Sequence, residues 1–182
     1  MSDQPYPFLS AMADTRRRAR RHIADGAADR DVVLRLLNES LATELACVLR
    51  YRHYCLMASG SLAQSIKDEF LKHSQEEQRH ADQLAQRIVQ LGGTPNFDGR
   101  GPADHGDSQY DEGDSLADMV EEDLIAERIA IENYREIIQY IGEKDTTTRR
   151  LFESILAVEE HHAEELASMR QALLHKQRMA SS

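Results

Sequence analysis

Several residue types that stabilise or anchor other classes of protein are scarce in this sequence. Among 182 residues there are no tryptophans, four prolines and only two cysteines. Two cysteines are too few for a disulfide-stabilised scaffold. The sequence has no apolar run of about 18 residues that would span a membrane, and its N-terminus has no apolar core typical of a secretory signal. We therefore expect a cytoplasmic protein with reduced thiols and no membrane contact.

Positive charge is also in the minority. Lysine and arginine total 22 against 32 aspartates and glutamates, which gives a formal net charge of −10. This balance argues against a general binder of polyanions and is compatible with attraction of cations. Hydrophobic residues make up 41% of the chain and follow a helical period over long stretches. These features predict a single all-α domain.

One segment departs from the acidic character of the chain. Residues 16–22 contain five arginines and one histidine, within a weakly patterned N-terminal extension over residues 1–30. A basic arm of this kind can contact DNA phosphates. It can also pack on a neighbouring subunit through arginine–carboxylate pairs, and the acidic total favours this second reading over DNA binding.

Apolar residues recurring every three or four positions predict four helices. They cover about residues 31–58, 66–91, 115–142 and 146–173. A short turn containing Gly60 makes the first two helices an antiparallel hairpin. The connection over residues 96–114 is long and glycine-rich, as a crossover along a bundle requires. We expect a four-helix bundle of two hairpins over residues 31–174, followed by a tail over residues 175–182 and no clear fifth helix.

The inward stripe of each predicted helix is interrupted by charged residues. Glu44 and Glu127 lie in the middle of the first and third stripes. The second and fourth stripes each carry a Glu-x-x-His pair, 33 and 32 residues after those glutamates. A buried charge needs a partner or a metal ion. The repeat predicts that six side chains meet at one depth in the bundle: Glu44, Glu77, His80, Glu127, Glu159 and His162.

This set of side chains indicates a particular metal chemistry. Four carboxylates and two neutral imidazoles carry the negative charge that two divalent cations neutralise. Carboxylates and imidazoles suit iron or manganese, and no thiolate is present to favour zinc. Carboxylates from both hairpins can bridge ions held about 3.5–4 Å apart, as they do in known two-metal bundles. A polar bundle core without metal is the alternative, since a single Glu-x-x-His pair is a weak signal.

Three other polar residues lie on the same stripes. Tyr51 and Tyr134 each follow a mid-stripe glutamate by seven residues. They can hydrogen-bond to ligating carboxylates or donate an electron, or simply fill the core. His73 lies one turn before Glu77, where a satisfied core histidine is favoured over a ligand on an iron entry path.

The remaining candidates carry less information. Cys47 and Cys55 are separated by about 12 Å along one helix, so they cannot form a disulfide with each other there. Each is interpreted first as a small apolar residue. His161, Glu76 and Glu160 are expected to point away from the stripes.

The sequence resembles the ferritin-like superfamily, and within it the bacterioferritins and the bacterioferritin-type branch of Dps-like proteins. The resemblance covers residues 32–169. It is carried by Leu37-Asn38-Glu39 through Tyr51, Glu77-x-x-His80-Ala81-Asp82, Gly92-Gly93-x-Pro95, Asp123-Leu124-x-x-Glu127 and Glu159-x-x-His162. It implies a ferroxidase centre with two iron ions per subunit, for which manganese or zinc can substitute, and with Glu77 and Glu159 as bridging carboxylates. Fe(II) would be oxidised by O₂ or H₂O₂ and kept as a ferric mineral inside a hollow homo-oligomer.

Three features depart from the bacterioferritin pattern. Gln78 occupies the position of the haem-ligating methionine, so we expect no haem. The absent fifth helix and the N-terminal extension favour a 12-subunit cage over one of 24 subunits. The cysteines need not match the pair found in the Dps-like branch, so no role is transferred to them.

Two other functions are compatible with the same bundle. One is a two-metal peroxidase or catalase that stores no mineral. The other is a DNA-protecting protein that uses the basic N-terminal arm and in which the metal site is secondary. Retention of iron separates the first from a storage cage, and salt-dependent DNA binding tests the second.

Overall fold

The structure is an all-α bundle of two helical hairpins, as expected from the sequence. The computed structural model describes residues 29–60, 63–98 and 115–180, and every regular element in these ranges is a helix. The helices are α2 (Arg30–Met57), α3 (Ala63–Gln90), α4 (Leu116–Ile141) and α5 (Thr146–Ala180). Within the described ranges, no helix is long and apolar enough to cross a membrane.

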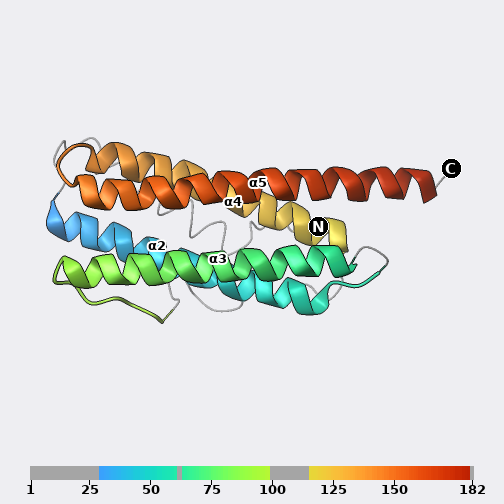
Figure 1. Ribbon diagram of the computed structural model, residues 1–182, viewed down its shortest axis with the longest axis horizontal. Helices are drawn as coiled ribbons and strands as arrows, with labels where there is room; N and C mark the ends of the chain where they lie inside the picture. Colours follow the sequence, from blue (N-terminus) through green and yellow to red (C-terminus); the bar gives the residue numbers. More distant parts are fainter. Residues whose placement is uncertain (1–28, 61–62, 99–114, 181–182) are drawn as a thin grey trace, which may run out of the picture.

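The predicted basic segment over residues 16–22 lies outside the described residues. The long connection is described only as far as residue 98. The tail predicted over residues 175–182 differs from the structure, because α5 continues to Ala180 and extends beyond its neighbours (Figure 1).

The two helices of each hairpin pack against each other. α2 lies against α3 and α4 lies against α5, and the two pairs face each other (Figure 1). Helix ends follow local chemistry: the Asp29 side chain accepts from the Asp31 N–H at 2.7 Å. Ser115 and Asp118 form a capping box at the start of α4.

The end of α3 requires glycine for steric reasons. Gly92 has a φ of 72°, in the left-handed region that favours glycine. A Cβ at Gly93 would lie 2.6 Å from Leu34 Cδ2, so the chain here packs directly on α2. Arg87, near the end of α3, donates to both carboxylate oxygens of Asp145 in the other hairpin, at 3.0 and 3.1 Å. This contact ties the α4–α5 turn to α3 and fixes the two hairpins in register.

The apolar core is divided into two clusters by a polar layer. One cluster contains Leu37, Leu41, Leu84 and Phe152, among others. The second contains Tyr51, Phe70, Leu124 and Leu166, among others. Along α2 the first cluster ends at Leu41 and the second begins at Cys47, which leaves Glu44 between them. The charged stripe residues therefore lie inside the bundle, with packed apolar layers on both sides.

Leu84 belongs to the apolar cluster on one side of this layer. Leu84 is fully buried, so Leu84→Ala leaves a cavity and should lower the free energy of unfolding by about 2–5 kcal/mol. Gln86→Ala, at an exposed position of the same helix, should change it by less than about 0.5 kcal/mol. Urea denaturation of the metal-free proteins measures both. Equal stability of the two variants would contradict the assignment of Leu84 to the core.

Candidate metal centre

All six side chains predicted to converge do so in the middle of the bundle. α2 contributes Glu44, α4 contributes Glu127, and α3 and α5 each contribute a Glu-x-x-His pair. None of the six residues is more than 5% exposed. The three-residue spacing places the glutamate and histidine of a pair one turn apart on the same helix face, so both point inward.

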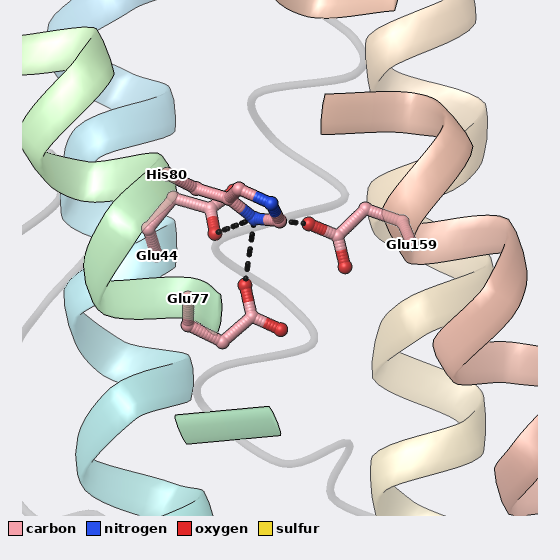
Figure 2. A group of neighbouring side chains, drawn as sticks. All are labelled: Glu44, Glu77, His80 and Glu159. Carbon is pink, nitrogen blue, oxygen red and sulfur yellow. Dashed lines mark hydrogen bonds and ion pairs between the residues drawn. The ribbon is translucent and has the colours of Figure 1, made fainter. Parts of the chain in front are cut away.

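The six residues form two overlapping groups of potential ligands. The first group is Glu44, Glu77, His80 and Glu159 (Figure 2). The second is Glu77, Glu127, Glu159 and His162. In each group one ligand atom per residue lies within 4.8 Å of the others. Glu77 and Glu159 belong to both groups, which is the arrangement expected of two bridging carboxylates.

In the first group, His80 is the centre of the contacts. Its Nδ1 atom lies 3.4 Å from Glu44 Oε2, 3.3 Å from Glu77 Oε2 and 3.0 Å from Glu159 Oε1. Figure 2 shows Glu159 reaching across from α5 toward the side chains of α2 and α3. One imidazole nitrogen and three carboxylates from three helices therefore surround a single point.

The second group repeats this geometry around His162. Its Nδ1 atom lies 3.1 Å from Glu77 Oε1, 3.4 Å from Glu159 Oε2 and 3.8 Å from Glu127 Oε1. The two oxygens of Glu77 and of Glu159 thus point toward different imidazoles. The internal repeat of the sequence appears in space as approximate two-fold symmetry of the site.

Several ligand atoms in this layer lack hydrogen bonds. Glu44 Oε2, Glu77 Oε1, both carboxylate oxygens of Glu159, and His162 Nδ1 are buried without a hydrogen-bond partner in good geometry. The imidazole contacts described above bring opposite charges close but do not satisfy these atoms. Buried polar atoms left unpaired are costly. Carboxylate oxygens and an imidazole nitrogen are suitable ligands for divalent cations, so these atoms fit a site for two metal ions.

The glutamates of the metal-free site differ in the direction of their pKa shifts. Burial, together with the charges of Glu77 and Glu159, raises the pKa of Glu44 and of Glu127 well above the usual range. Burial would also raise the pKa of Glu77, but its contacts with Glu44 and the two histidines hold it well below that range. These shifts favour the protonated form of Glu44 and Glu127 and the ionised form of Glu77.

The pKa values of the two imidazoles rise, whereas the pKa of an isolated buried histidine falls. Burial opposes their charged form, but contacts with Glu159 and Glu77 raise the pKa of His162 to about 12. Contacts with Glu159, Glu44 and Glu77 likewise raise the pKa of His80. These shifts favour charged imidazoles beside ionised carboxylates in the metal-free site. Two divalent cations would neutralise all four carboxylates.

Tyr51 and Tyr134 hold the two outer carboxylates. The Tyr51 hydroxyl donates to Glu127 Oε1, and the Tyr134 hydroxyl donates to Glu44 Oε1. Each tyrosine therefore contacts the glutamate of the other hairpin, which the seven-residue spacing alone does not indicate. Both tyrosines are at most 2% exposed and belong to the apolar clusters. They orient Glu44 and Glu127 while linking the hairpins.

Glu76 is a site residue that the spacing of residues along α3 did not indicate. It was expected to point away from the core, but its Oε2 atom lies 2.8 Å from His162 Nε2. A carboxylate on the outer nitrogen of a histidine fixes the ring and leaves the inner nitrogen for a metal. Because Glu76 reaches α5 across the helix interface, only the three-dimensional alignment of α3 and α5 reveals the contact. Glu160, by contrast, is exposed and pairs with Arg135 at 2.6 Å, as expected of an off-stripe residue.

Arg50 and Asp123 form a second contact that the sequence did not indicate. Arg50 Nε donates to Asp123 Oδ1 at 2.5 Å, and both side chains are buried. The pair joins α2 to α4 next to Tyr51. Burial raises the pKa of Asp123 to about 6, against the opposing effect of Arg50. A buried ion pair of this kind fixes register between helices.

His73 and the two cysteines belong to neither ligand group of the centre. His73 is fully buried, its ring stacks on that of His162 with centroids 4.0 Å apart, and burial lowers its pKa to about 4. Cys47 is buried, and burial raises the pKa of its thiol, which suits a packing role. Cys55 is partly exposed, and both cysteines are free.

Comparisons with known proteins agree with this geometry. Residues 34–174 match the family model described as a ferritin-like domain. The bacterioferritin of Mycobacterium avium is 33% identical over 135 residues, which cover 74% of this chain and 80% of that protein.

Two solved structures share the fold. One is a dodecameric thioferritin, the bacterioferritin-related protein of Bacteroides fragilis. It has a TM-score of 0.73 and 27% identity, covering 86% of this chain and 95% of that one. The other is the Desulfovibrio desulfuricans bacterioferritin, described with its diiron site. It has a TM-score of 0.67 and 26% identity, covering 82% of this chain and 86% of that one. On this evidence, the chain belongs to the ferritin-like family.

Proposed function

We propose that this protein oxidises Fe(II) at a dinuclear centre within each subunit and stores the product as a ferric mineral inside a hollow homo-oligomer. The observation that carries the proposal is the pair of overlapping ligand groups that share Glu77 and Glu159. Similarity to bacterioferritins and to a diiron bacterioferritin structure supports iron as the metal.

Each residue of the centre has a distinct role in this proposal. Glu44 and His80 hold one Fe(II), and Glu127 and His162 hold the other. Glu77 and Glu159 bridge the two ions, and Tyr51 and Tyr134 orient the outer carboxylates. Manganese or zinc can occupy the same ligands, because carboxylate and imidazole donors accept all three metals.

A pair of ions suits the oxidation chemically. Each Fe(II) gives up one electron, whereas reduction of O₂ to H₂O₂, or of H₂O₂ to water, takes two. Binding two Fe(II) side by side matches the supply of electrons to this demand. The buried carboxylates also favour Fe(III) over Fe(II), since negative ligands stabilise the more highly charged ion. Ferroxidase activity is therefore the enzymatic part of the proposal.

Assembly into a cage rests on two observations. A structural neighbour is dodecameric, which supports a 12-subunit assembly over one of 24. On α2, Leu49 and Leu56 lie two turns apart and are 62% and 80% exposed. Exposed apolar residues on one helix face are typical of a surface covered by another subunit. Haem stays outside the proposal, because Gln78 stands where the resemblance would require methionine.

The experiment that tests the proposal is an anaerobic Fe(II) titration of the metal-free protein, followed by addition of O₂ or H₂O₂. We expect two Fe(II) bound per subunit, and then retention of many more iron ions per subunit in a soluble assembly after oxidation. Two ions bound and none retained beyond them would contradict storage and leave a two-metal peroxidase or catalase. Absence of tight binding would contradict the metal centre.

Replacement of Glu127 should weaken metal binding while changing the stability of the metal-free protein little. Because the raised pKa favours the protonated, uncharged form of this acid without metal, Glu127→Gln should change the free energy of unfolding of the metal-free protein by less than about 1 kcal/mol. The amide is a poor metal ligand, so Mn²⁺ should raise the melting temperature much less in the variant than in the parent. Differential scanning calorimetry measures both effects.

The matched control for this prediction is Glu132→Gln, a half-buried glutamate on the same helix that pairs with Arg135. It should retain the full Mn²⁺-dependent rise in melting temperature. An equal rise in Glu127→Gln and in the parent would show that Glu127 does not bind metal.

A further inference from the structure

A third group of potential metal ligands lies at the surface between α3 and α5. It consists of Glu69, His73 and Glu165, whose ligand atoms lie within 4.8 Å of one another. The group shares no residue with the two groups of the dinuclear centre. The side chains of Glu69 and Glu165 are 39% and 24% exposed, so the group is open to solvent on one side.

The inner side of this group is formed by a buried imidazole that points toward it. His73 is fully buried, and its Nε2 atom lies 2.9 Å from Glu165 Oε2. The group therefore differs from a cluster of surface acids, because a buried imidazole faces a partly exposed carboxylate from another helix. It supplies the nitrogen ligand that transition-metal ions prefer over purely oxygen sites.

A positive group already occupies the outer side of the cluster. The Lys72 ammonium lies 2.7 and 2.9 Å from the two oxygens of Glu165 and 3.5 Å from Glu69 Oε2. The same carboxylates that face His73 thus hold a cation in this structure. The Lys72 side chain is 41% exposed, so it can turn into solvent when another cation takes its place.

We propose that Glu69, His73 and Glu165 form a third divalent-cation site, which the Lys72 ammonium closes when no metal is bound. One imidazole and two carboxylates suit Fe²⁺, Mn²⁺, Co²⁺ or Zn²⁺. Two ligands of one ion, each at about 2.1 Å, lie no more than about 4.2 Å apart. The ligand atoms of the three residues, which lie within 4.8 Å of one another without metal, are therefore close to that limit.

The position of this site links it to the dinuclear centre. The His73 ring stacks on the His162 ring, with centroids 4.0 Å apart and planes 22° apart. His162 in turn faces Glu77 and Glu159 through Nδ1. The third site therefore lies one side chain outward from the proposed iron pair. Ions held there are positioned to supply the pair, but the site is defined by its own ligands.

Equilibrium titration of the full chain with Co²⁺, monitored by visible absorption, tests the proposal. The parent should bind three Co²⁺ tightly per subunit. Glu165→Gln should bind two, because it loses the carboxylate shared by His73 and Lys72. The matched control is Glu164→Gln, an exposed neighbour on α5, which should still bind three.

Lys72→Gln gives a result that a merely structural salt bridge would not produce. Removal of the competing ammonium should tighten the third Co²⁺ roughly tenfold while leaving the other two unchanged. Unchanged or weaker binding in this variant would overturn the proposal, as would three tight ions in Glu165→Gln.

The outcome also separates this site from the dinuclear centre. A parent that binds only two Co²⁺, both retained in Glu165→Gln, would overturn the third site and leave the iron pair intact. A parent that binds a single Co²⁺, lost in Glu165→Gln, would support the third site and contradict the pair.

Discussion

The structure depends on the burial of four carboxylates at one level of a helical bundle. Removing a carboxylate from water is costly unless it is neutralised. Here Glu77 and Glu159 lie among imidazoles, while Glu44 and Glu127 accept hydrogen bonds from tyrosines of the opposite hairpin. The apolar clusters above and below exclude water from this layer. The contacts at this layer therefore tie all four helices together at one level.

The same carboxylates are offset by different charges with and without metal. Without metal, the pKa shifts favour protons on Glu44, Glu127 and both imidazoles. Two divalent cations offset all four carboxylates once those protons leave. Stability and function thus use the same charges, and the buried oxygens left without hydrogen bonds are the atoms that a metal pair would satisfy.

The sequence predicted the helices and the six converging residues because both depend on periodicity along one helix. Glu44 and the two Glu-x-x-His pairs interrupt apolar stripes, so burial of those stripes determines where they point. Contacts between helices were not predictable in this way. Glu76 reaches His162, and Tyr51 reaches Glu127, only because the alignment of the hairpins brings them together. The extension of α5 to Ala180 was missed because its last residues are mostly polar and carry no apolar stripe.

The central claim is that the six side chains hold two metal ions between Glu77 and Glu159. Anomalous X-ray diffraction from crystals grown anaerobically with Fe(II) tests it most directly. The account predicts two iron peaks about 3.5–4 Å apart, one beside His80 and one beside His162. A single peak in this layer, or none while iron binds elsewhere, would contradict it.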